Sequence, residues 1–293
     1  MENCLVTKLK GTVNNDSLPI LNAIRIKANA GTYTAGSIAL MFNKKSSIDG
    51  LNGAELYSGG VSVGTTFPFY VDIANEVSPQ NEGGNYVIRN KYNLTHFNST
   101  KGNGLLEYEL DEFKELPSIT AFTSKNDIVK GDLSSFKNCP LTSFTLNKVS
   151  ADVYGDFSEL PSTITVLDLS SLNKAYNTSE LSHLVNVVTL AVGTNDLLTG
   201  PITDFGNMKS ITTLNVASTC LAGDIVDFVA IQRGGSNPRT TCDRISMSWA
   251  GGVGRGLKFN GTEISASAST YIHWDAQKLY LNQGGTDVAE VSF

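Results

Sequence analysis

The 293-residue sequence predicts a mainly β protein, in which an N-terminal antiparallel β-domain precedes a solenoid with a parallel sheet and a C-terminal β cap. Three observations predict this architecture. Apolar and polar residues alternate in short segments up to about residue 90, one apolar phrase repeats from residue 94 to residue 228, and the rhythm then loosens. Alternation with a period of two indicates strands. A repeat of about two dozen residues indicates stacked coils.

The amino-terminal part contains alternating segments at residues 5–9, 24–28, 38–42 and 69–73. Glycine- and asparagine-containing stretches separate them, as is typical of strands joined by turns. We expect residues 1–92 to form a small antiparallel sandwich or barrel that serves in docking or assembly and closes one end of the repeats.

The repeated phrase spans six residues and has apolar residues at its first, fourth and sixth positions. Its clearest copies begin at residues 141, 164, 187 and 211, which are intervals of 23, 23 and 24 residues. Two divergent copies begin at Leu94 and Ile119 and place Ser99 and Ser124 at the third position. The clear copies consist of Leu141, Phe144 and Leu146; Ile164, Leu167 and Leu169; Val187, Leu190 and Val192; and Ile211, Leu214 and Val216.

A second signature of six residues follows most copies. It has a glycine at its first position and apolar residues at its third and sixth positions. The glycines are expected where the backbone turns into a conformation that a Cβ disfavours. Each coil then reads as a strand, a turn and a loose helical or extended return, over residues 93–231. The signature occurs at Gly131, Leu133 and Phe136; Gly155, Phe157 and Leu160; Gly200, Ile202 and Phe205; and Gly223, Ile225 and Phe228.

Residues 232–293 are expected to hold divergent repeats and the closing cap. A polar insertion spans residues 232–241, and the phrase either recurs at Cys242 and at Ala276 or ends before them. Residues 257–259 and the terminal Val288, Val291 and Phe293 indicate closing strands.

The residues between the apolar positions of neighbouring strands should form one continuous surface. Two interpretations remain open: the surface docks a partner, or threonine and valine are there because they suit strands. The candidate interaction surface consists of Thr142, Ser143, Thr145, Thr165, Asp168, Thr189, Thr212, Thr213 and Asn215.

The composition argues against several partners. A net charge of −6 without a Lys/Arg cluster argues against nucleic acid and anionic membranes. No secretory signal and no apolar stretch long enough to span a membrane is visible. The four cysteines lack any C-x-x-C pair, so we expect them to be reduced, although Cys220 and Cys242 lie one repeat apart and could form a bridge.

No set of residues predicts catalysis, a metal site or a cofactor. His96, His183 and His273 belong to different coils, and the glycine cluster from Gly251 to Gly256 precedes an expected strand rather than a helix. The acids of three segments, residues 111–112, 126–132 and 152–156, are interpreted as solvated loop acids because they lack calcium-loop spacing. We therefore expect a protein that is not an enzyme. The least favoured alternative is a carbohydrate-active enzyme that uses face acids such as Asp168.

The repeats resemble the leucine-rich repeat family, in particular its variety of about 24 residues with a Gly-x-Ile element. Leu190, Val192, Gly200, Pro201 and Ile202 come nearest to that form. The resemblance covers roughly residues 94–228 and implies a recognition or assembly function. The family's asparagine position is filled by Lys148, Leu172, Asn195 and Thr219, so only one copy keeps the asparagine.

The amino end is similar to virion proteins of the crAss-like tailed phages of gut Bacteroides. The similarity rests on residues 4–10, 14–19 and 24–26. It implies a structural or adhesive particle component, made in the host cytoplasm, that contacts other virion proteins and itself. A host surface glycan or protein is a further candidate partner. The alternative is a bacterial leucine-rich-repeat protein that binds a protein or a glycan. Neither implies a cofactor.

Overall fold

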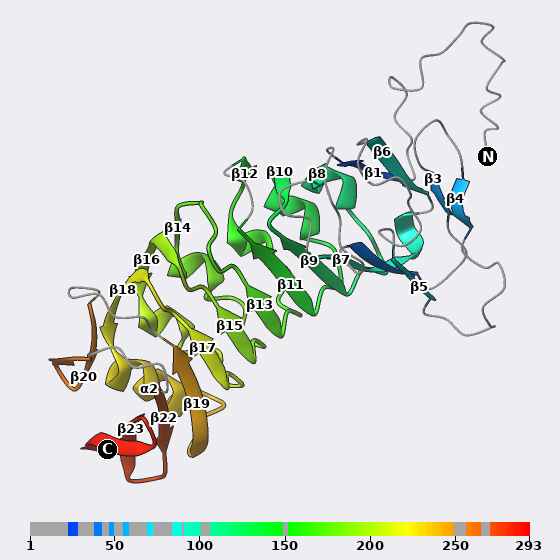
Figure 1. Ribbon diagram of the computed structural model, residues 1–293. Helices are drawn as coiled ribbons and strands as arrows, with labels where there is room; N and C mark the ends of the chain where they lie inside the picture. Colours follow the sequence, from blue (N-terminus) through cyan, green and yellow to red (C-terminus); the bar gives the residue numbers. More distant parts are fainter. Residues whose placement is uncertain are drawn as a thin grey trace, which may run out of the picture.

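The computed structural model describes residues 23–28, 38–42, 47–49, 55–58, 69–72, 84–89, 91–100, 106–148, 152–248, 256–264 and 270–293. Stacked coils form an elongated molecule with a long sheet on one side and shorter strands on the other (Figure 1). The protein is therefore mainly β and has a leucine-rich-repeat-like solenoid fold.

The repeated phrases form the parallel part of a 12-stranded sheet. Phe144, Leu167, Leu190 and Leu214 lie in register on neighbouring strands, which confirms the predicted parallel pairing across residues 141–216. The strand at Cys242 also pairs parallel with its predecessor, but Met247 rather than Ile245 lies opposite Leu214, so the expected copy from Cys242 is wrong by two residues. These strands are β7 (Leu94–Ser99), β9 (Ala121–Lys125), β11 (Ser143–Asn147), β13 (Val166–Asp168), β15 (Thr189–Ala191), β17 (Thr213–Asn215) and β19 (Cys242–Ser248).

The opposite side of each coil carries a short strand followed by a helical turn. The strands are β8 (Leu106–Glu109), β10 (Ile128–Asp132), β12 (Val153–Tyr154), β14 (Tyr176–Asn177), β16 (Asn195–Pro201) and β18 (Thr219–Asp224). The turns are η3 (Leu110–Phe113), η4 (Leu133–Phe136), η5 (Phe157–Glu159), η6 (Thr178–Leu181), η7 (Ile202–Phe205) and the longer α2 (Ile225–Arg233).

The glycines of the second signature sit where these strands meet the turns, and each has a positive φ. A Cβ at Gly155 would lie 2.2 Å from the Asp132 carboxylate, and one at Gly200 would meet the Thr178 hydroxyl at 2.1 Å. Glycine is therefore required by both conformation and space. Aspartate side chains then cap the turns: Asp132 and Asp156 each accept a hydrogen bond from the backbone N–H two residues later.

The strands of the amino-terminal part extend both sides of the solenoid. β2 (Ile38–Phe42) pairs antiparallel with β7 and with β5 (Phe69–Asp72), whereas β1 (Ala23–Ala28) joins β8 to β6 (Gly84–Arg89). The hairpin of β3 (Ser47–Asp49) and β4 (Glu55–Ser58) continues from β6, and η2 (Lys91–Asn93) precedes β7. Three of the four predicted strands are confirmed, and residues 5–9 lie outside the described residues. The domain division at residues 92 and 231 stays a prediction.

The carboxy-terminal cap is antiparallel. β22 (Thr270–Trp274), β23 (Lys278–Gln283) and β24 (Thr286–Ser292) follow β19 as a meander, so the second expected recurrence, at Ala276, is wrong: its strand runs antiparallel to its neighbours. The predicted closing strands are confirmed as β24 and as β20 (Leu257–Phe259), which forms a hairpin with β21 (Thr262–Glu263).

The inward residues of successive coils form one core along the molecule. Its first half is aromatic: the rings of Phe97 and Phe122 stack at 5.4 Å and those of Phe122 and Phe144 at 5.5 Å, close to the spacing of adjacent strands. Phe113 and Phe136, from η3 and η4, contact the Phe122 ring from the other side. Aliphatic side chains replace this column from Leu167 onward.

Candidate interaction face

The outward side chains of the 12-stranded sheet form one surface, here called the interaction face because it is the candidate for binding, and the strand register arranges its central part in three rows. The first row lies just before the strands and contains Thr142, Thr165 and Thr212. The second row contains Ser143, Val166, Thr189, Thr213 and Ser246, and the third contains Thr145, Asp168, Ala191 and Asn215. The structure therefore brings all nine predicted surface residues to one side of the sheet.

The first row is used to join coils. The hydroxyls of Thr142 and Thr165 each donate to the carbonyl oxygen of the equivalent residue one coil earlier, at 3.1 Å in both cases. Thr212 does the same to Val188 at 3.4 Å, and Thr120 to Thr95 at 3.3 Å. The same carbonyl oxygens also accept backbone N–H groups. These threonine hydroxyls are therefore committed to stacking.

The second row is partly open to solvent. Val166 is 39% exposed and Thr213 is also exposed, whereas Ser143, Thr189 and Ser246 are half-buried. The hydroxyls of Ser143, Thr189 and Thr213 form no side-chain hydrogen bond with the part of the chain that the structure describes. This row is the part of the predicted surface that remains available to a partner.

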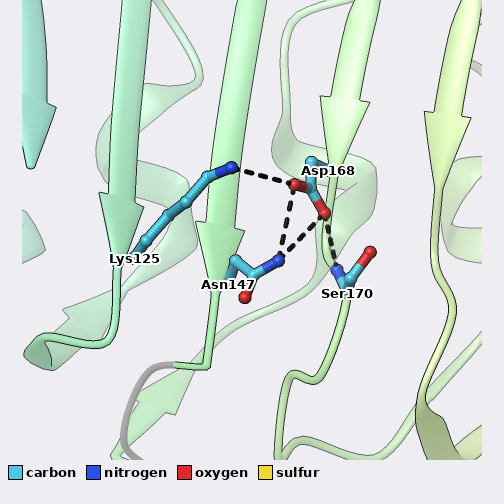
Figure 2. A network of polar contacts seen from close by, with 4 residues as sticks. All are labelled: Lys125, Asn147, Asp168 and Ser170. Atoms are coloured by element: carbon cyan, nitrogen blue, oxygen red, sulfur yellow. Dashed lines mark hydrogen bonds and ion pairs between the residues drawn. The ribbon is translucent and has the colours of Figure 1, made fainter. Parts of the chain in front are cut away.

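The third row is held in place by an ordered polar network (Figure 2). Asp168 accepts hydrogen bonds from the Ser170 N–H at 3.0 Å and from the Asn147 amide at 3.4 Å, and its carboxylate lies 3.7 Å from the Lys125 ammonium. Asn215 repeats the first contact by accepting from the Ala217 N–H at 3.1 Å. Thr145, beside Asp168, is only 7% exposed. The network fixes the turns that follow the strands.

Aromatic and charged side chains replace the small ones where the face continues into the cap. Tyr271 lies opposite Ser246, and His273 lies opposite Tyr280, so all share the outward side. Trp274, by contrast, is 3% exposed and belongs to the core. Burial alternates along β22: Thr270, Ile272 and Trp274 are buried, whereas the two residues between them point outward.

The asparagine position of the family turns inward beneath the face. The Asn195 amide donates to the carbonyl oxygens of Leu169 and Val192 and to the Tyr176 hydroxyl, and the Thr219 hydroxyl donates to the Val216 carbonyl. Leu172 is buried there instead.

The assignment of Lys148 to this position is wrong by one residue. Lys148 has a φ of 52°, as Ser171, Thr194 and Ser218 have positive φ values immediately before the position in their own coils. The position itself therefore falls on residue 149, which lies outside the described residues. In the preceding coil it is filled by Asp127.

Asp127 is 3% exposed, so the interpretation of this residue as a solvated loop acid is wrong. Its Oδ2 accepts hydrogen bonds from the Ser124 hydroxyl at 2.9 Å and from the Tyr108 hydroxyl at 3.0 Å. Burial raises its pKa to about 6, although the hydrogen bonds from Ser124 and Tyr108 act in the opposite direction. The other loop acids are also engaged: Asp111 accepts from Ser135, and Asp132 and Asp156 cap turns.

The candidate histidines and cysteines do not come together in one site. His96, His183 and His273 lie on β7, after η6 and on β22, respectively. Cys220, on β18, and Cys242, on β19, are in different sheets, and both thiols are free, as is that of Cys139. Cys4 and residues 251–255 lie outside the described residues, while Gly256 precedes strand β20 as expected.

The described residues contain no group of three or more His, Cys, Asp or Glu side chains that could hold a metal ion. They also contain no helix with the length and hydropathy needed to cross a bilayer.

Comparisons with known proteins support no closer assignment. No protein-family model matches the sequence, and no curated protein matches it significantly. Among solved structures, the chain is similar to two leucine-rich-repeat ectodomains from Arabidopsis thaliana. The SOBIR1 receptor kinase ectodomain is 16% identical over 48% of this chain and 74% of its own, with a TM-score of 0.32. The BIR2 ectodomain is 18% identical over 56% of this chain and 70% of its own, with a TM-score of 0.30.

Proposed function

We propose that the protein is a non-enzymatic binding protein and that another protein docks on its interaction face. One observation supports this most directly: the second row offers exposed Val166 and three hydroxyls without internal side-chain partners on neighbouring strands. Flat surfaces of small side chains allow close approach, and their unused hydroxyls can bond across an interface.

The finer proposal is a structural or adhesive component of a tailed phage particle that contacts other virion proteins and further copies of itself. The similarity of residues 4–26 to virion proteins of crAss-like phages motivates it. Mass spectrometry of purified particles tests it, because a virion component must be present there in stoichiometric amounts. The alternative, a bacterial protein with a protein or glycan ligand, is equally compatible with the face and predicts absence from particles.

The proposed face is tested by blocking it. Thr189→Arg and Thr213→Arg place a long charged side chain in the second row, whereas Thr199→Arg places one on an exposed position of β16 in the opposite sheet. With a purified partner, we expect the two face variants to weaken binding about tenfold or more and the control to bind normally. Loss of binding in the control alone would overturn the assignment of the face.

The non-enzymatic part of the proposal is tested with Asp168→Asn. A carbohydrate-active enzyme using face acids would show glycan cleavage in the unmodified protein and lose it in this variant. We expect no turnover from either protein in a screen of bacterial surface polysaccharides. Measurable cleavage that depends on Asp168 would refute this part.

A further inference from the structure

The cap end of the interaction face carries four side chains in mutual contact, Arg244, Tyr271, His273 and Tyr280, here called the arginine–tyrosine patch. The Arg244 guanidinium lies 4.5 Å from the centre of the Tyr271 ring. Tyr271 and His273 are 5.7 Å apart, and the rings of His273 and Tyr280 stack at 4.8 Å with 10° between their planes. The patch spans β19, β22 and β23, all on the outward side.

Polar contacts hold His273 in place within the patch. The His273 Nε2 lies 3.0 Å from an Asp287 oxygen, and the same oxygen accepts the amide of Asn282 at 2.8 Å. Asn282 is itself only 3% exposed. Side chains fixed in this way lose little conformational entropy when a ligand arrives, which favours binding.

The charged side chains in and around the patch differ in whether they have a polar partner. Lys278 pairs with Glu290 at 2.7 Å, and His273 contacts Asp287. Other arginines bond to protein oxygens: Arg233 donates to Ala276, and Arg239 to Ile211. Arg244 is exposed and, within the described residues, contacts an aromatic ring but no carboxylate or carbonyl oxygen.

An exposed guanidinium over an aromatic ring matches a carboxylate, which it can bind through two parallel hydrogen bonds. Tyrosine and arginine are also the side chains that contribute most to protein interfaces, whereas surrounding small residues contribute mainly by excluding water. The patch adjoins such small residues, because Ser246 of the second row lies directly opposite Tyr271.

We propose that the arginine–tyrosine patch is the docking site for an acidic segment of a protein partner. A partner Asp or Glu carboxylate bonds to Arg244, and apolar side chains beside it pack on Tyr271 and Tyr280. This inference rests on the proposed function and assigns it a location and a ligand chemistry. An acidic glycan offers the same carboxylate but no apolar side chains for the tyrosines.

The test uses a displayed library of random 12-residue peptides selected on the full-length protein. Selected peptides are synthesised, and their affinities are measured for the unmodified protein, Arg244→Ala, Arg244→Lys, Tyr271→Leu and the control Lys258→Ala. Lys258 is exposed on β20 in the other sheet. Thermal unfolding of each variant establishes that it is folded.

We expect selected peptides to be enriched in Asp or Glu next to an apolar residue. Their affinity should fall about tenfold or more for Arg244→Ala and Tyr271→Leu, and less for Arg244→Lys, which keeps the charge but loses the fork. Lys258→Ala should bind normally, and added salt should weaken binding.

Three results would overturn the inference, and the first of them separates it from the proposed function. In the first, peptides bind all patch variants normally but lose affinity for Thr189→Arg. This result would mean that the interaction face binds the peptides without the arginine–tyrosine patch. Binding of oligogalacturonate that depends on Arg244, without binding of acidic peptides, replaces the protein segment by a glycan. Failure to select any peptide on the unmodified protein counts against both proposals.

Discussion

Replacing Asp127 by Asn should stabilise the protein at neutral pH. The carboxyl group is buried, and its pKa of about 6 lies above the ordinary value of 3.8. An Asn carbonyl oxygen can accept the same two hydroxyls, from Ser124 and Tyr108. Its amide group can donate as that of Asn195 does at the equivalent position, where the carbonyl three residues earlier accepts it.

The magnitude follows from proton linkage. The folded state holds a proton on Asp127 between pH 4 and 6 more firmly than the unfolded state does, so the free energy of unfolding falls as pH rises through this window. A shift of about 2 pH units corresponds to about 3 kcal/mol of lost stability above pH 6. Asp127→Asn avoids this loss, because it carries no titrating group.

Urea unfolding followed by circular dichroism from pH 4 to pH 8 measures this difference. Other titrating groups are common to both proteins, so they cancel when the two free energies of unfolding are subtracted. We expect the variant to gain up to about 3 kcal/mol at pH 8 relative to its difference at pH 4. Tyr108→Phe removes a hydrogen bond to the charged carboxylate. Relative to the unmodified protein, the free energy of unfolding of this variant should therefore be lower at pH 8 than at pH 4. A difference between Asp127→Asn and the unmodified protein that stays constant from pH 4 to pH 8 would refute the reasoning.

Three further substitutions test the packing of the coils by thermal or urea unfolding. Gly155→Ala combines a φ of 87° with a Cβ placed against Asp132 and should cost about 2 kcal/mol or more of stability. The control Gly261→Ala has a positive φ but open space around its Cβ and should cost about 1 kcal/mol. Equal costs would contradict the close contact at Gly155. Asn195→Ala leaves two buried carbonyl oxygens and the Tyr176 hydroxyl without their donor and should cost about 2 to 4 kcal/mol; a cost below about 0.5 kcal/mol would argue against this network. Phe122→Ala removes the ring at the centre of the aromatic column and should cost about 3 to 5 kcal/mol, and a much smaller loss would mean that the column repacks.

The sequence predicts the strands of the long sheet well, because their apolar period directly reports which side chains face the core. Phe144, Leu167, Leu190 and Leu214 occupy the predicted inward positions in register. The signature glycines were equally informative, since few conformations other than a positive φ require glycine at a repeated position. The antiparallel cap at residues 270–292 was harder to predict, because alternating apolar residues do not reveal strand direction.

The turn positions show where sequence reasoning fails. In the other copies the asparagine position follows the third apolar residue by three, so Leu146 indicates residue 149 rather than Lys148, and the positive φ values agree with this spacing. Asp127 appeared to be a surface acid, because charged residues are rarely buried without a charged partner. Its burial depends on hydroxyls of Tyr108 and Ser124, and Tyr108 lies 19 residues away in the sequence.

The same hydrogen bonds that make the stacking regular also restrict where this protein can bind. A threonine hydroxyl at the first row of each coil satisfies a carbonyl of the preceding coil, and releasing it to a ligand would leave that stacking bond unmade. The third row is likewise engaged around Asp168 and Asn215. The uncommitted hydroxyls of the central face are therefore those of the narrow second row, whose small side chains bury little area. A tight interaction requires larger side chains, and the interaction face offers them at its cap end, where Arg244, Tyr271 and Tyr280 project from the strands that close the solenoid.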